Sequence, residues 1–140
     1  MVQDYLRRVV GYNKYYITTG GGAINAGASF TIDLASGPGE FLGFTIYHYG
    51  GADASYVNAL IELKADAVVI YGGVMRDLLG CAFTTAFHNL FATNDVIAAD
   101  AQVQSFKSLI PYESTMSVKF TNNGANQVGL AMLVHHRVYR

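Results

Sequence analysis

The sequence predicts an all-β fold, an antiparallel β-sandwich of about eight short strands. Three observations support this prediction. Apolar and polar residues alternate in several segments, and turn signals separate these segments at intervals of about 8–15 residues. Val, Ile, Thr, Tyr and Phe predominate within them, as is usual in strands. The chain has 140 residues, which suits one domain.

The N-terminal segment differs from the rest. Residues 1–14 have a weakly helical spacing of apolar residues and precede a glycine-rich stretch. A helix of this length is marginal in water by itself. We therefore expect an N-terminal arm or short helix over residues 1–14 that docks on its own barrel or on a neighbouring subunit. Residues 15–140 are predicted to form the sandwich domain.

The first clear strands lie between residues 28 and 51. Residues 28–36, ASFTIDLAS, have the two-residue period of a strand with one buried face. Gly37, Pro38 and Gly39 then form a turn signal. Residues 41–51, FLGFTIYHYGG, return to the same period. The pattern places Phe44, Ile46 and His48 on one face and Thr45, Tyr47 and Tyr49 on the other.

Residues 56–73, YVNALIELKADAVVIYGG, form the longest extended stretch. Propensity alone also allows a helix here, because Ala, Leu, Glu and Lys favour helices. Alternation favours strands, with a bend near Ala65 and Asp66. One predicted face carries Ile61, Leu63, Ala65, Ala67 and Val69, and the other carries Glu62, Lys64, Asp66, Val68 and Ile70.

The end of the chain has the clearest β pattern. Met116, Val118 and Phe120 alternate with polar residues, and Asn123-Gly124 is a strong turn signal. The segment 128–139 is apolar on both faces, which predicts a central strand covered on both sides. Together these features predict a terminal hairpin inside the sandwich.

Composition excludes some classes of function. The net charge is −1 and the nine Lys and Arg are scattered, so we expect no nucleic-acid partner. Charged residues make up 14% of the chain, below the roughly 25% of a typical soluble domain. This suggests that other subunits cover part of the surface. No segment approaches the roughly 20 apolar residues of a membrane span, and no signal peptide is visible.

No catalytic, cofactor or metal site is predicted, so the chain is not expected to be an enzyme. His135 and His136 are adjacent on a strand and point to opposite faces, so they cannot share one metal. A zinc site that includes His48 is an alternative, as in a small β-barrel enzyme of cupin type. Tyr47 and Tyr49 are candidates for a subunit contact, because tyrosine is enriched at interfaces. Ordinary packing and the stacking of a sugar are the alternatives for these two residues.

The layout resembles the single jelly-roll structural proteins of viruses and bacteriophages, of the minor capsid, decoration or head-fibre type. Three segments carry the resemblance, and they cover about half of the chain. They are ITTGGGAINAGASFTIDL at 17–34, IELKADAVVIYGG at 61–73, and IPYESTMSVKFTNNGANQVGLAMLVHHRVYR at 110–140.

The resemblance implies a jelly roll and a structural role in a virion, as a capsid, decoration, minor capsid or tail component. Such proteins assemble as homo-oligomers, with trimers favoured, and contact a larger capsid or tail protein. The arm would then reach onto a neighbour, where Arg7 and Arg8 would pair with acidic groups. A carbohydrate-binding or receptor-binding β-sandwich module is the alternative function. The protein is expected to be synthesised in the host cytoplasm and to reside in the virion.

Overall fold

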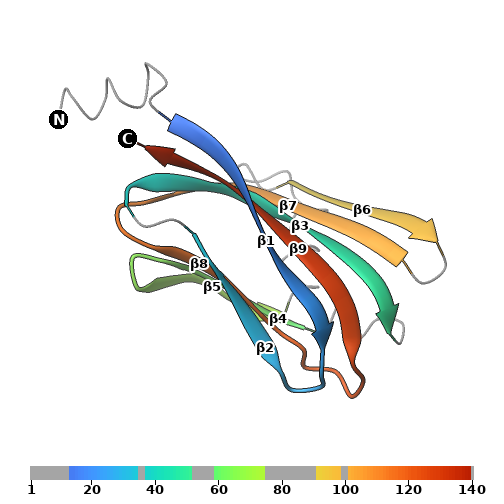
Figure 1. Cartoon of the computed structure of the whole chain (residues 1–140). Helices are drawn as coiled ribbons and strands as arrows, with labels where there is room; N and C mark the ends of the chain where they lie inside the picture. The colour runs from blue at the N-terminus through green and yellow to red at the C-terminus, as the bar shows by residue number, and fades with distance from the viewer. Residues whose placement is uncertain (1–12, 35–36, 52–58, 75–90, 99–100, 140) are drawn as a thin grey trace, which may run out of the picture.

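In the computed structural model the chain forms two antiparallel β-sheets that face each other (Figure 1). The described residues are 13–34, 37–51, 59–74, 91–98 and 101–139. The predicted all-β sandwich is confirmed. The described residues form nine strands, where the sequence suggested about eight.

Each sheet takes strands from distant parts of the chain. The five-stranded sheet has the order β1 (Asn13–Ile24), β9 (Val128–Tyr139), β3 (Gly39–Gly51), β7 (Ala101–Tyr112) and β6 (Phe91–Ala98). The four-stranded sheet has the order β2 (Ser29–Asp33), β8 (Met116–Thr121), β4 (Leu60–Ala65) and β5 (Val68–Val74).

The pairing of the strands is nested. β1 pairs with β9 along its whole length, from Asn13 opposite Tyr139 to Ile24 opposite Val128. One step inward, β2 pairs with β8 in the other sheet. β3 then lies between β9 and β7, and β4 lies between β8 and β5. The first and last strands are therefore neighbours, and strands from nearer the middle of the chain pair beside them.

The core lies between the two sheets and is built by strict alternation. Along β9 every second residue from Val128 to Val138 is buried, and β8 buries Met116, Val118 and Phe120. Two aromatic pairs fill the space: the ring centroids of Phe44 and Phe106 are 5.3 Å apart, and those of Phe30 and Phe120 are 5.5 Å apart. Such pairs stabilise a core beyond the area that they bury. The alternation predicted for residues 116–120 and for Ile61, Leu63 and Ala65 is confirmed.

A bulge in β3 depends on glycine. The register of β3 shifts between Phe41 and Gly43 against both β7 and β9. Gly43 has a φ of 142°, and a Cβ at this position would collide with the backbone carbonyl of Phe106. Only glycine adopts this conformation without strain, so the bulge is fixed by the residue type. It lets β3 bend while it remains paired on both sides.

The final segment departs from its prediction. β9 is indeed a central strand, between β1 and β3. The predicted terminal hairpin is wrong, because β8 pairs with β2 and β4 while β9 lies in the opposite sheet. Residues 122–127 therefore cross from one sheet to the other. A turn signal marks a reversal of direction, and both a hairpin and a sheet-to-sheet corner require one.

Asn122 organises this corner from inside. Its side chain is fully buried and donates through Nδ2 to the backbone carbonyls of Ile24, at 2.9 Å, and Asn126, at 2.8 Å. Its Oδ1 accepts the backbone N–H of Gly124 at 3.0 Å. One neutral side chain thus satisfies three backbone groups that the corner turns away from the sheets.

Residues 60–74 form a hairpin of two strands, and the bend predicted near Ala65 and Asp66 lies at its turn. Asp66 and Ala67 both have positive φ, 48° and 67°, and form the two-residue turn between β4 and β5. This is the geometry of a type I′ turn, which matches the twist of the strands beside it. The face predicted for Ala67 and Val69 is therefore wrong, because the turn and a bulge in β5 reset the alternation.

Some predictions fall outside the described residues. They include the N-terminal arm through residue 12, with Arg7 and Arg8. β1 already begins at Asn13, close to the predicted start of the domain. Within the described part of the chain, no helix has the length and hydrophobicity needed to cross a membrane.

Candidate interaction surface

The outer face of the four-stranded sheet combines exposed apolar residues on β5 with an open groove. β4 buries Ile61, Leu63 and Ala65, so Leu60, Glu62 and Lys64 project outward. On β8 the outward residues are Ser117, Lys119 and Thr121. The strand pairing places Glu62 beside Lys119 and Leu60 beside Thr121. A cation and an anion therefore lie next to each other on this face.

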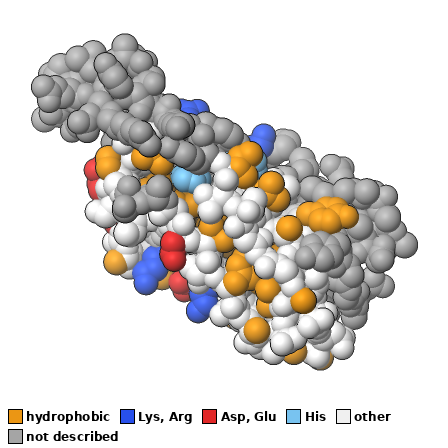
Figure 2. All heavy atoms as spheres, viewed as in Figure 1, with side chains coloured by type: hydrophobic (Ala, Val, Ile, Leu, Met, Phe, Trp, Pro, Cys, Tyr) orange, Lys and Arg blue, Asp and Glu red, His pale blue; other side chains and the backbone are white. Residues whose placement is uncertain are grey.

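β5 is the last strand of the four-stranded sheet in the described residues, and it exposes apolar side chains. Val68, Val69 and Ile70 are 61%, 50% and 50% exposed. The strand, VVIYGGV, has neither a charged residue nor a proline. Charges, prolines and β-bulges are common means by which proteins protect edge strands from association, and of these β5 has only the bulge at Ile70. Figure 2 shows that charged side chains are also sparse on the described part of one face of the molecule.

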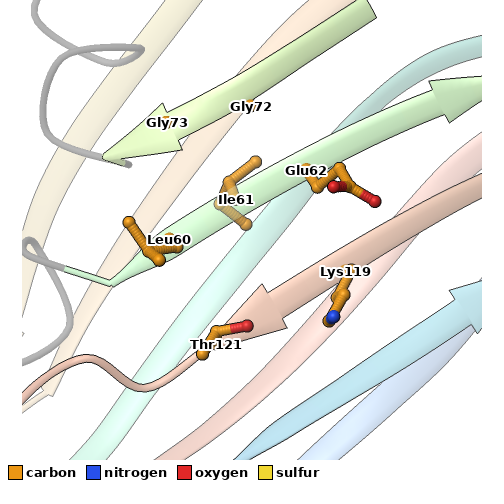
Figure 3. Close-up of a pocket in the computed structure, with 7 residues that line it drawn as sticks. All are labelled: Leu60, Ile61, Glu62, Gly72, Gly73, Lys119 and Thr121. Carbon is orange, nitrogen blue, oxygen red and sulfur yellow. The ribbon is translucent and has the colours of Figure 1, made fainter. Parts of the chain in front are cut away.

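An open groove lies beside this strand. Its volume is about 370 Å³. Gly72 and Gly73 leave it unfilled on the β5 side, and Figure 3 shows the side chains of β4 and β8 that border it. The lining residues are Leu60, Ile61, Glu62, Gly72, Gly73, Lys119 and Thr121. None of these described residues is aromatic, so they offer no ring on which a sugar could stack.

Asp66 fixes the hairpin that carries β5. Its carboxylate accepts the backbone N–H groups of Glu113 and Ser114, each at 2.7 Å, and of Thr115 at 3.0 Å. Its own backbone N–H donates to the carbonyl of Thr115 at 2.9 Å. The turn is thus tied to the loop between β7 and β8. Aspartate suits this position because its short side chain tolerates positive φ.

The electrostatics of this tie follow from its geometry. The backbone N–H groups of Glu113, Thr115 and Ser114 hold the pKa of the Asp66 carboxyl below its ordinary value of 3.8. Hydrogen bonds to the ionised form favour ionisation. The carboxylate is solvent-exposed, so the tie depends on its charge and not on burial.

The predicted interface residues lie elsewhere. Tyr47 is half-buried on β3 and pairs with Ala131 and Val103 in the five-stranded sheet. Tyr49 lies on the same strand, but its side chain is outside the described residues. These two tyrosines are therefore on the opposite sheet from β5. The structure does not bring them together with the groove.

The histidine doublet is split by the strand. His135 is half-buried, and its Nε2 lies 3.4 Å from Thr45 Oγ1. His136 is buried, and its Nε2 lies 3.0 Å from Thr18 Oγ1. Burial lowers the pKa of both imidazoles, and Lys107 lowers that of His135 further. Both rings are therefore neutral at pH 7 and hydrogen-bonded to threonine hydroxyls on neighbouring strands.

The described residues contain no group of three or more His, Cys, Asp or Glu arranged to hold a metal ion. The side chain of His48 lies outside the described residues, so a site that includes it stays an alternative from the sequence alone.

The sequence reasoning missed the β5 surface. It divided Val68, Val69 and Ile70 between two faces of a continuous strand. Two signals were present: three consecutive bulky apolar residues, and the glycine pair Gly72-Gly73 directly after Tyr71. Glycine inside a strand often marks a bulge or a close backbone approach, and a bulge does lie next to this pair in β5.

Comparison with known proteins gives little further guidance. No family model and no curated protein matches the chain. One solved structure with detectable similarity is described as "Crystal Structure of FLHE". It shares 11% sequence identity, covers 91% of this chain and 97% of its own, and has a TM-score of 0.34. A score this low supports no argument about this chain.

Proposed function

We propose that this protein is a structural subunit of a virion, a capsid, decoration, minor capsid or tail component, and that it acts by self-assembly and protein contacts rather than by catalysis. The observation that carries the proposal is the β5 surface. Among the described strands β5 is the last of its sheet, and an uncharged strand with three exposed apolar residues beside an open groove is suited to a protein partner.

The strand order supports the architecture that this proposal requires. The orders β1-β9-β3-β7 and β2-β8-β4-β5 arise when an antiparallel hairpin of strands folds over on itself. We infer that the eight strands follow jelly-roll connectivity, with β6 added at the edge next to β7. Viral capsid proteins, lectins and cupins share this fold, so the fold alone does not choose among them.

The surface chemistry favours the structural role among these three. A lectin would need aromatic or polar groups converging on a sugar, and none of the described residues that line the groove is aromatic. A cupin would need a cluster of metal ligands, whereas His135 and His136 lie on opposite faces of β9. β5 exposes the apolar side chains of Val68, Val69 and Ile70, and their burial against a partner would stabilise a complex.

Sedimentation of the purified chain over a wide concentration range tests self-assembly. We expect species heavier than the 15.1 kDa monomer, with trimers favoured by the resemblance. The test for the virion is separate: the chain should be found by mass spectrometry in purified particles released when the source cells lyse. A chain that stays monomeric at all concentrations and is absent from particles would contradict the proposal.

A further inference from the structure

The corner between β8 and β9 contains Asn123-Gly124, which is the one Asn-Gly pair in the sequence. The side chain of Asn123 is exposed, and Gly124 is half-buried. In an Asn-Gly pair the backbone nitrogen of the glycine can attack the asparagine side chain, because glycine has no Cβ to hinder the approach. The pair therefore carries a chemical reactivity besides its role as a turn signal.

The reaction is deamidation. The backbone nitrogen of Gly124 loses its proton to solvent and attacks Cγ of Asn123. A bond forms between this nitrogen and Cγ, the bond between Cγ and Nδ2 breaks, and ammonia leaves. Water then opens the cyclic succinimide and leaves aspartate or isoaspartate at position 123. The balance is one water consumed and one ammonia released, with no oxidation or reduction.

Asn122 holds the nitrogen that would attack. The backbone N–H of Gly124 donates to Oδ1 of Asn122 at 3.0 Å. This acceptor is itself fixed, because Asn122 is fully buried and its Nδ2 donates to the carbonyls of Ile24 and Asn126. A hydrogen-bonded amide releases its proton to solvent only when the bond opens, and its hydrogen exchange reports the same event.

We propose that Asn123-Gly124 is a deamidation site of the folded protein, and that the hydrogen bond from Gly124 to Asn122 sets its rate. The exposed carboxamide of Asn123 is accessible to water in every molecule. The nitrogen that attacks it is available only in the fraction of molecules in which this one hydrogen bond is open. A buried side chain therefore controls the reaction of its exposed neighbour.

Local opening is the step that releases the nitrogen. Residues 122–127 lie outside the strands of both sheets, so opening at Gly124 breaks few contacts. Unfolding of the whole sandwich would expose the same nitrogen, but it would also expose the core between the sheets. Local openings need less free energy than global unfolding, so they dominate the reaction under native conditions.

The product changes the corner. Residues 122–127, NNGANQ, carry no charge. Conversion of one neutral carboxamide to a carboxylate changes the formal net charge of the chain from −1 to −2. Isoaspartate also adds a methylene to the main chain where it crosses from one sheet to the other. The reaction depends on the corner alone, so it does not require that the protein be a virion subunit.

Asn25 is an internal comparison in the same corner. Its side chain is also exposed, and its Oδ1 accepts Nε2 of Gln127 at 2.6 Å. The next residue is Ala26, whose Cβ hinders attack by the backbone nitrogen. We therefore expect product at Asn123 before any is detectable at Asn25.

The first experiment compares the folded protein with a peptide. The full chain and the peptide KFTNNGANQV, residues 119–128, are incubated at pH 8. Mass spectrometry measures aspartate and isoaspartate at Asn123, and NMR measures the hydrogen exchange of the Gly124 amide. The protein should react more slowly than the peptide by the protection factor of that amide, within about threefold.

Two outcomes of this comparison would overturn the inference. One is equal rates in the protein and the peptide, which would mean that the hydrogen bond to Asn122 does not restrain the nitrogen. The other is product at Asn123 far below the amount that the exchange rate of Gly124 predicts, which would mean that the folded corner forbids the attack.

A variant tests the role of Asn122. Asn122→Ala removes the acceptor, so deamidation of Asn123 and hydrogen exchange of Gly124 should both accelerate about tenfold, equivalent to about 1.4 kcal/mol. Leu63→Ala is the matched control, because Leu63 is buried in β4 and its truncation destabilises the core without touching the corner. It should leave the rate at Asn123 within about twofold, a change of less than 0.5 kcal/mol.

The control separates local opening from unfolding. Equal acceleration by Asn122→Ala and Leu63→Ala would mean that the reaction proceeds through global unfolding, and the role of Asn122 would be wrong. If Asn122→Ala does not fold, the comparison of wild type and peptide decides alone, because it uses the intact corner.

Discussion

At each end of the sandwich, one side chain makes three hydrogen bonds to the backbone of a connecting segment, but the two side chains differ in chemistry. At one end, the buried carboxamide of Asn122 satisfies three backbone groups of the corner between β8 and β9. At the other, the exposed carboxylate of Asp66 accepts three backbone N–H groups of the loop between β7 and β8. Asn122 is a neutral, buried side chain, whereas Asp66 is a charged, exposed one. The two ends should therefore respond differently to mutation and to pH.

Removing the buried tie should have the largest effect. Asn122→Ala leaves the buried carbonyl of Ile24, and the part-buried carbonyl of Asn126 and N–H of Gly124, without their partner. We expect the free energy of unfolding to fall by about 3 kcal/mol, measured by chemical denaturation at pH 7 and pH 5. The loss should be the same at both pH values, because the carboxamide does not titrate.

Asn123→Ala is the matched control for this prediction. Asn123 is the exposed neighbour in the same corner, and its replacement should change stability by less than about 0.5 kcal/mol. Equal losses from the two substitutions would show that the corner is not held by the buried side chain.

Removing the charged tie should have a smaller effect that depends on pH. Asp66→Asn keeps the shape and tolerates the positive φ, but it removes the charge and turns a donor towards one of the N–H groups. We expect the thermal midpoint at pH 7 to fall by a few degrees, measured by circular dichroism. The hairpin that carries β5 should loosen with it.

The sign of the pH dependence follows from the lowered pKa of Asp66. Its contribution to stability is fully present above the ordinary carboxyl pKa of 3.8 and is lost as the pH falls through the lower value of the folded state. The difference between wild type and Asp66→Asn should therefore shrink as the pH falls below 3.8. A difference that stays constant down to pH 2 would contradict a role for the charge.

The smallest effect is expected at Tyr112, next to the charged end. Its side chain is buried, and its Oη has no hydrogen-bond partner in the described residues. Tyr112→Phe removes a buried polar atom that gains nothing from folding, so we expect a change of less than about 1 kcal/mol at pH 7. A large loss in chemical denaturation would mean that the hydroxyl, and not the Asp66 carboxylate, holds this end.

The same variant has a signature at high pH. Burial, and then the Asp66 carboxylate, raise the pKa of Tyr112 above its ordinary value of 10.0. The wild type should therefore lose stability as the pH rises above 10, because the unfolded chain releases the proton more readily. Tyr112→Phe lacks this group, so its advantage over the wild type should grow between pH 9 and pH 11.

The sequence was most informative where one local pattern determines one structure. Alternation identified the buried face of β8 and β9, and an apolar pattern on both faces marked β9 as a central strand. It was less informative at reversals of direction. Asn123-Gly124 predicted a turn correctly but not which sheet the chain would enter next. Asp66-Ala67 reads as part of an alternating strand until the turn is seen.

The sequence by itself determined the all-β fold class, the buried positions of β4, β8 and β9, and the uncharged character of VVIYGGV. These properties follow from side-chain period and composition over a few residues. Only the tertiary structure decided which strands are neighbours, since pairing depends on contacts between residues far apart in the chain. It placed β5 last among the described strands of its sheet, set Gly72 beside Glu62, and brought Asp66 to the loop at 113–115. An exposed surface belongs to the arrangement of strands, and no single strand can specify it.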